Sequence, residues 1–222
     1  MTHPFLQGLK APLHISHRGG AALQPENTLR AFDAAVRQWR TDVLELDLHA
    51  TKDGELVVAH DSTVERCTDG EGAIADLTWA EVSKLDAGFR FKPASGFPLR
   101  GFGVTIPRFV EVLRAFPLVR LNVELKDPRA LDAFVALVKE EKAVARICAG
   151  SEFDELAGSL AAALPEACLF YPADALAAFI LPVLNDEPPT DDGRFTVLDM
   201  PLIWQGLKLF EPRIRDAAAA RG

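Results

Sequence analysis

Short runs rich in valine, isoleucine and leucine alternate with longer amphipathic runs along most of this chain. The short runs predict buried strands at residues 13–17, 43–48, 119–125, 145–149, 167–171 and 195–199. The longer runs carry apolar residues three and four positions apart, which is the spacing of a helix with one buried face. Strands that alternate with helices favour an α/β fold with a parallel sheet, either closed as a barrel or open and doubly wound.

Several helix starts are marked by their first residues. Asn27 or Thr28 is expected to cap the first helix, and Ser151 is expected to cap a later one. Pro128 and Pro212 stand at the first positions of two further predicted helices, where a missing backbone N–H costs little.

Residues 61–106 interrupt this alternation. They contain several glycines and prolines and one predicted short helix, which begins with the capping-box sequence TWAE at Thr78–Glu81. An insertion of this length is commonly functional, so we expect it to lie over one mouth of the sheet. The sequence thus predicts a single domain over residues 1–222 with an insertion at about 61–106.

Composition limits the partners and the compartment. Thirty-two acidic and 24 basic residues give a formal charge of −8, which opposes binding to nucleic acid and to anionic membranes. Cys67, Cys148 and Cys168 are widely spaced and odd in number, which argues against a disulfide framework. The N-terminus resembles no signal peptide and the longest apolar run is too short to span a bilayer. We expect a soluble cytoplasmic protein without stable membrane insertion.

Two predicted strands each carry polar residues on one face. Glu45 and Asp47 share a face of the second strand, and Asn122, Glu124 and Lys126 share a face of the third. In a barrel these faces converge at the carboxyl ends of the strands, where such folds place their active sites. At about 4 Å and an effective dielectric of about 20, each pair of carboxylates repels by roughly 4 kcal/mol. A hard divalent cation such as Mg²⁺ or Ca²⁺ would relieve that repulsion.

Two histidines are predicted to lie beside these carboxylates. The Asp-Gly step at Asp53 predicts a tight hairpin whose return strand brings His60 close to Glu45 and Asp47. His17 ends the first predicted strand. A single buried histidine or a single Glu-x-Asp pair is often structural, but here the motifs occur together on strands expected to be central.

Two positively charged side chains are expected to lie near these histidines and carboxylates. Arg18 and Lys126 supply fixed positive charge, and the whole inventory fits the cleavage of a phosphodiester. His3 and His14 are expected to be structural, and for His49 a structural role is favoured over one in shaping the rim of the site.

Motifs through most of the chain resemble those of the glycerophosphodiester phosphodiesterase family, a branch of the phospholipase-C-like TIM-barrel phosphodiesterases. The motifs are SHRGG from Ser16, PENT from Pro25, ELDL from Glu45, TKDGELVVAHD from Thr51, ERCTDGEG from Glu65, LTWAEVSKLDAG from Leu77, IPRFVEVL from Ile106 and NVELK from Asn122. The resemblance implies a (β/α)8 barrel, hydrolysis of a glycerophosphodiester to sn-glycerol 3-phosphate and an alcohol such as choline or ethanolamine, and one divalent cation, Mg²⁺ or Ca²⁺, with Mn²⁺ as a third candidate.

The resemblance also implies roles for nine residues. His17 and His60 are the acid/base pair, with neither assigned as acid or base. The expected metal ligands are Glu45, Asp47 and Glu124. The expected phosphoryl-binding residues are Arg18 and Lys126, and the residues expected to fix the loop after the first strand are Glu26 and Asn27.

By the family's pattern, the six predicted strands are the first six of eight, and the last two are not in this sequence. We expect a fragment of a longer protein rather than two copies that cover each other, although a homo-oligomer remains an alternative. An open barrel exposes the edge of its first strand, which favours association.

Three questions of function stay open at this stage. The substrate alternatives are lysophospholipids or sugar phosphodiesters, for which Phe89, Phe91, Phe97 and Phe102 are either contacts or packing residues of the insertion. The attacking group is either water or a hydroxyl of the substrate. A truncated, non-catalytic barrel that binds phosphate esters is the alternative of a different class.

Overall fold

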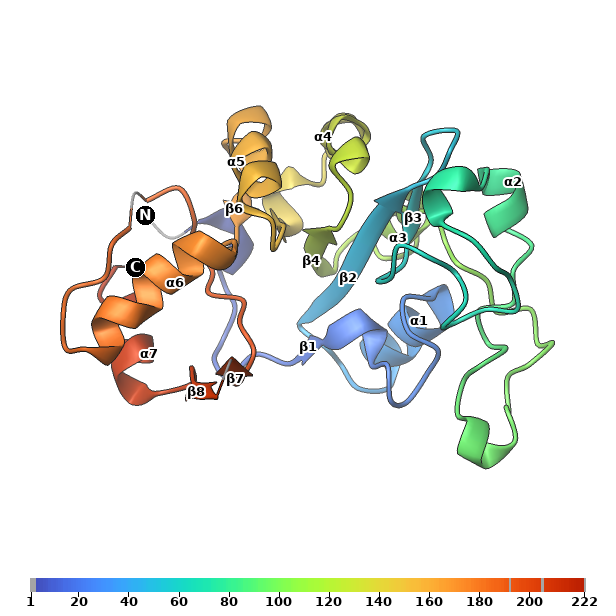
Figure 1. The fold of residues 1–222 in the computed structure, drawn as a ribbon, viewed down its shortest axis with the longest axis horizontal. Coiled ribbons are helices and arrows are strands. Elements are labelled where there is room, and N and C mark those ends of the chain that lie inside the picture. Colours follow the sequence, from blue (N-terminus) through green and yellow to red (C-terminus); the bar gives the residue numbers. More distant parts are fainter. Residues whose placement is uncertain (1–2, 192, 205, 222) are drawn as a thin grey trace.

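The computed structural model describes residues 3–191, 193–204 and 206–221. Within them a six-stranded sheet has the order β1-β2-β4-β5-β6, and β3 pairs with β2 alone (Figure 1). β3 runs antiparallel to β2, whereas the other neighbours run parallel. The strands are β1 Ile15–Ser16, β2 Val43–Ala50, β3 Leu56–Val58, β4 Arg120–Leu125, β5 Ile147–Gly150 and β6 Cys168–Leu169. The predicted α/β fold with a parallel sheet is confirmed.

Helices alternate with most of these strands. They are α1 Leu29–Arg37, α2 Trp79–Val82, α3 Phe109–Ala115, α4 Leu131–Glu140, α5 Asp154–Ala163, α6 Ala173–Leu184 and α7 Pro212–Ala219. In Figure 1, α6 and α7 lie beyond β6 at one end of the molecule, and α2 lies beyond β3 at the other. Among the described residues, every helix is too short or too polar to cross a membrane.

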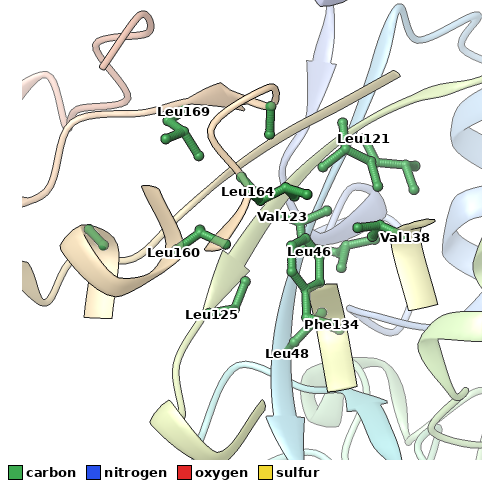
Figure 2. Packing of buried hydrophobic residues seen from close by; sticks show 14 of the residues in the cluster. Leu46, Leu48, Leu121, Val123, Leu125, Phe134, Val138, Leu160, Leu164 and Leu169 are labelled. Carbon is green, nitrogen blue, oxygen red and sulfur yellow. The ribbon is translucent and has the colours of Figure 1, made fainter. Parts of the chain in front are cut away.

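The outer faces of β2 and β4 carry the main core. Figure 2 shows their apolar side chains packed against helices α4 and α5. Successive side chains of a strand point to opposite faces, so burial of the apolar set fixes which face the polar set takes. Burying each leucine or phenylalanine stabilises the fold by about 1.5–3 kcal/mol. The residues are Leu46, Leu48, Leu121, Val123, Leu125, Phe134, Val138, Leu160 and Leu164.

The helix starts follow the sequence signals with one exception. Thr28 caps α1, where its Oγ1 accepts a hydrogen bond from the N–H of Ala31 at 3.2 Å. Pro212 begins α7, as expected, and Pro128 begins a 3₁₀ turn, Pro128–Ala130, that leads into α4. The prediction for Ser151 is wrong, because the N-cap of α5 is Phe153. The hydroxyl of Ser151 instead accepts a hydrogen bond from the N–H of Phe153 at 3.2 Å, so Ser151 orders the turn before the helix.

The predicted strand at 195–199 is not formed. In the described residues the segment makes one parallel bridge to the sheet end, between Phe170 and Val197. At this bridge the N–H of Val197 donates to the carbonyl of Leu169 at 3.1 Å, and the N–H of Tyr171 donates to the carbonyl of Val197 at 3.0 Å. The N–H of Thr196 also donates to the carbonyl of Leu169, at 2.7 Å. A short hairpin follows, β7 Ile203–Trp204 and β8 Leu207–Lys208. The sheet of the described residues is therefore open between β1 and β6.

Residues 61–106 pack around a small core of their own. The core joins Val57 of β3 to apolar residues of the segment, Val64, Ile74, Val82, Ala87, Val104 and Ile106. The segment contains the expected short helix α2, in which Glu81 accepts a hydrogen bond from the N–H of Thr78 at 2.8 Å, and two 3₁₀ turns, Ile74–Asp76 and Pro93–Ser95. In Figure 1 the segment lies at the end of the molecule that carries β3. The division into one domain with an insertion stays a prediction.

Candidate active site

The loop after β1 turns sharply at three consecutive residues whose backbone is in the left-handed conformation. Arg18, Gly19 and Gly20 have φ of 51°, 74° and 92°. A Cβ on Gly19 would lie 2.8 Å from the ring of Phe32, and one on Gly20 would lie 2.7 Å from Trp39. Glycine therefore suits both positions for conformation and for space. At Arg18 the same conformation costs about 1–3 kcal/mol, which the surrounding contacts must offset.

Those contacts place Arg18 among three carboxylates. Its backbone N–H donates to Oε2 of Glu45 at 2.6 Å. Its guanidinium lies 3.1 Å from Oε1 of Glu26 and 3.6 Å from Oδ2 of Asp47. Asn27 donates from Nδ2 to the same Asp47 oxygen at 2.9 Å. Glu26 and Asn27 both contact Arg18 of this loop, Asn27 by donating its backbone N–H to the carbonyl of Arg18 at 3.0 Å. Their role in fixing the loop stays a prediction.

The register of β2 and β4 brings the polar faces together. Glu45 lies opposite Asn122, and Asp47 lies opposite Glu124, all four on the inner face. Lys126 forms an ion pair with Glu124 at 2.8 Å. The expectation that these strand faces converge is thus met for Glu45, Asp47 and Glu124 by direct neighbours in the sheet.

Negative charge exceeds positive charge at these strand ends. Burial, and next the adjacent Asp47, raise the pKa of Glu45 to about 8. Burial also raises the pKa of Glu124, although Lys126 opposes the shift. A buried carboxyl with a raised pKa lacks a full counter-charge.

The donor chemistry of these residues fits a hard divalent cation. All three carboxylates offer oxygen, the ligand that Mg²⁺ and Ca²⁺ prefer. The buried Oδ1 atoms of Asn27 and Asn122 accept no hydrogen bond from the described residues. Within those residues no group of three or more histidine, cysteine, aspartate or glutamate side chains has the spacing of a formed metal site. Arg18 and Lys126 pair with the carboxylates in this conformation.

A cavity of about 360 Å³ opens beside these groups. His17, Glu45, Glu124 and Lys126 line its polar side. Burial, and next the charge of Arg18, lower the pKa of His17, so its imidazole is neutral near pH 7. The opposite wall is largely apolar and comes from β6, α6 and the residues that follow: Phe170, Tyr171, Leu176, Ala177, Ile180, Leu181, Met200, Pro201, Trp204 and Leu209.

His60 lies on a different pocket. The hairpin between β2 and β3 forms as expected, and the N–H of Ala59 donates to the carbonyl of Asp47 at 3.0 Å. The side chain of His60, however, lines a pocket of about 30 Å³ together with Glu26 and Asn27. Its Nδ1 lies 2.6 Å from Oδ1 of Asp61. The structure therefore brings Ala59, the residue before His60, to the backbone of Asp47, but it does not place the two histidines on one cavity.

Three further residues contact the site and were not among the predicted ones. Asp199 lines the larger cavity and accepts a hydrogen bond from Asn122 at 2.7 Å. Asp61 contacts His60, and Arg66 joins Asp61 to Glu26. Asp61 and Arg66 lie within the motifs TKDGELVVAHD and ERCTDGEG, and Asp199 ends the predicted strand at 195–199, but none of the three was assigned a role from the sequence.

Comparisons with known proteins find a family and relatives that match part of this chain. The model of the glycerophosphoryl diester phosphodiesterase family matches residues 17–160. A glycerophosphodiester phosphodiesterase of Caldanaerobacter subterraneus is 43% identical over 119 residues, which cover 51% of this chain and 45% of that relative. A human lysophospholipase D is 42% identical over 117 residues, which cover 51% of this chain and 36% of the relative. The match thus spans less than half the length of either relative.

Solved structures show the same fold. A glycerophosphodiester phosphodiesterase from Agrobacterium tumefaciens superposes with a TM-score of 0.70 at 26% identity, covering 93% of this chain and 83% of that chain. An Oleispira antarctica phosphodiesterase, solved in complex with the product sn-glycerol-3-phosphate, superposes with a TM-score of 0.63 at 31% identity, covering 72% and 65%. The predicted TIM-barrel type of fold is confirmed, with the sheet open in the described residues. This chain belongs to the glycerophosphoryl diester phosphodiesterase family.

Proposed function

We propose that the protein hydrolyses glycerophosphodiesters to sn-glycerol 3-phosphate and an alcohol, with one divalent cation, Mg²⁺ or Ca²⁺. The observation that carries this proposal is the cavity of about 360 Å³ on which a histidine, a lysine and two carboxylates meet, His17, Lys126, Glu45 and Glu124. The relatives named as glycerophosphodiester phosphodiesterases, and the neighbour solved with sn-glycerol-3-phosphate, support the choice of substrate.

Each polar group has a task that its position suits. Arg18 and Lys126 hold the phosphoryl oxygens, because guanidinium and ammonium groups donate charge-assisted hydrogen bonds to phosphate. His17 and His60 exchange protons with the attacking and leaving oxygens. His17 is neutral near pH 7, so it can accept a proton from the attacking oxygen.

The cation would be held by Glu45, Asp47 and Glu124. When bound, it supplies charge that polarises the phosphoryl group. Arg18 and Lys126 must then exchange these carboxylates for the phosphoryl oxygens, and His60 must approach the larger cavity. The three cysteines are free, which suits the reducing cytoplasm in which we propose that the protein acts.

The test is release of glycerol 3-phosphate from glycerophosphocholine, measured with Mg²⁺ or Ca²⁺ and after chelation. Chelation abolishes turnover, and readdition of the ion restores it. Asp47→Asn and Glu124→Gln each lower kcat by about 100-fold or more, because each removes a charge that the cation requires. As a matched control, Asp33→Asn changes an exposed carboxylate on α1 and leaves kcat unchanged. Turnover that survives both chelation and Asp47→Asn refutes the proposal.

The apolar wall of the cavity favours lysophospholipids as a second class of substrate. Leu176, Ile180 and Trp204 on that wall can contact an acyl chain beside the reacting phosphodiester. A relative is named lysophospholipase D, which agrees with this reading. Comparing kcat/KM for glycerophosphocholine and lysophosphatidylcholine decides between them. A higher kcat/KM for lysophosphatidylcholine supports lysophospholipids as the substrate class, provided that Ile180→Asn removes this preference.

A further inference from the structure

Arg66, a residue of the 61–106 segment, holds two carboxylates of the site at once. Its Nη1 and Nη2 donate to both oxygens of Glu26, at 2.9 and 2.7 Å. Its Nε and Nη2 donate to both oxygens of Asp61, the latter at 3.1 Å. A guanidinium presents its donors in a rigid planar fork, so two bidentate contacts fix the relative position of both carboxylates.

One of these carboxylates orients a histidine. Oδ1 of Asp61 lies 2.6 Å from Nδ1 of His60. Hydrogen bonds from Arg66 first, and then the contact with His60, lower the pKa of Asp61 to about 2. An ionised Asp61 accepts, so Nδ1 of His60 carries the proton and Nε2 is left to exchange one with a substrate.

The backbone of His60 is held by a separate contact. Nε2 of the buried His49 lies 3.1 Å from the carbonyl oxygen of His60. The imidazole is thus fixed through its main chain by β2 and through its ring by Asp61. The orientation of the ring then depends on the position of the Asp61 carboxylate. Among the described residues, Arg66 fixes that carboxylate by donating to both of its oxygens.

We propose that Arg66 is a positioning residue that acts through Asp61 to set the tautomer and orientation of the His60 imidazole. The inference rests on the proposed function, because it gives His60 a proton-transfer role. It goes beyond that function by assigning part of the catalytic geometry to the 61–106 segment. Arg66 does not contact the reacting atoms in this arrangement, and its effect is transmitted by Asp61.

The experiment compares Arg66→Met and Arg66→Lys with the wild type. Arg37→Met is the matched control, because Arg37 forms an exposed ion pair with Asp33 on α1. With glycerophosphocholine, Arg66→Met lowers kcat by about 10–100-fold and changes KM by less than about threefold, since proton transfer is affected more than binding. Arg66→Lys keeps the positive charge but loses the planar set of guanidinium donors, so its kcat falls between those of the wild type and Arg66→Met. Arg37→Met keeps the wild-type kcat.

A double-mutant cycle separates positioning from a general structural effect. In an Asp61→Asn background, Arg66→Met lowers kcat by less than about threefold more, because the group through which it acts is already neutral. In a Glu26→Gln background, Arg66→Met keeps most of its effect on kcat. The imidazole Nδ1–H proton of His60, assigned by its loss in His60→Gln, gives a second readout by NMR. That resonance disappears in Arg66→Met and persists in Arg37→Met.

The inference is overturned by any of three results. They are a kcat of Arg66→Met within threefold of the wild type, an equal loss in the Asp61→Asn background, and an unchanged Nδ1–H resonance in Arg66→Met. If the wild type turns over no glycerophosphodiester, the proposed function fails by itself. The NMR comparison then still decides whether Arg66 sets the state of His60.

Discussion

At the scale of single residues, Gly150 shows how the polar strand ends leave room for a cavity. It lies on β5 directly opposite Glu124, and a Cβ there would be 2.6 Å from the ring of Phe170. That ring lines the cavity beside His17. Any larger residue at 150 must displace the ring, so the absence of a side chain at this position shapes the cavity wall.

We therefore predict that Gly150→Ala destabilises the protein by about 1–3 kcal/mol, the usual cost of an overpacked core. KM for glycerophosphocholine rises as well, because Phe170 moves into the cavity. Gly158→Ala is the matched control, since Gly158 lies within α5 and a Cβ there meets nothing within 4 Å. Alanine favours a helix over glycine by about 1 kcal/mol, so the control is more stable than the wild type. Urea unfolding measures both, and equal behaviour of the two variants contradicts the prediction.

At the scale of elements, helix α1 supports the loop that carries His17 and Arg18. Phe32 and Ala31 of α1 lie against Gly19, at distances that exclude a side chain there. The position of the loop therefore depends on how firmly the first turn of α1 is held. Thr28 holds it by accepting from the N–H of Ala31 and by donating to the carbonyl of Pro25 at 2.7 Å.

We predict that Thr28→Ala lowers the free energy of unfolding by about 1–2 kcal/mol, because it removes a cap and leaves a buried carbonyl without its donor. Thr28→Ser keeps the hydroxyl and restores most of the loss. Urea unfolding of the two variants tests this. A serine variant as unstable as the alanine variant would assign the effect to the lost methyl group instead of the hydrogen bonds.

At the scale of the whole molecule, the sequence predicted the features that depend on local period. The two-residue repeat placed Glu45, Asp47 and Glu124 on one face, and the sheet register confirms it. The sequence could not predict how the 195–199 segment would pair with the sheet, because that pairing depends on residues far along the chain. The link from Arg66 to Glu26 spans 40 positions and has no local signature either. Nor could it foresee that His60 lies on a separate pocket, since side-chain orientation follows from such long-range contacts.

Acid stability tests the same long-range link in the molecule as a whole. The folded-state pKa of Asp61, about 2, lies below the usual aspartate value of about 3.9. A carboxyl with a depressed pKa stabilises the fold above its unfolded pKa, and that contribution is lost as the pH falls through the folded value. Asp61 therefore contributes stability above about pH 4 that disappears towards pH 2. Arg66 also lowers the pKa of Glu26, so both contributions depend on one guanidinium.

We predict that Arg66→Met loses less stability between pH 4 and pH 2 than the wild type does. The lowering of the Asp61 pKa from about 3.9 to about 2 corresponds to at most roughly 2.6 kcal/mol, and solvent screening of these partly exposed groups reduces the difference to about 1 kcal/mol. Arg37→Met keeps the wild-type slope, because its pair is exposed and lies apart from this network. Urea unfolding at half-unit steps of pH measures the three slopes. Parallel slopes for the wild type and Arg66→Met would mean that Asp61 is not held by Arg66 in solution.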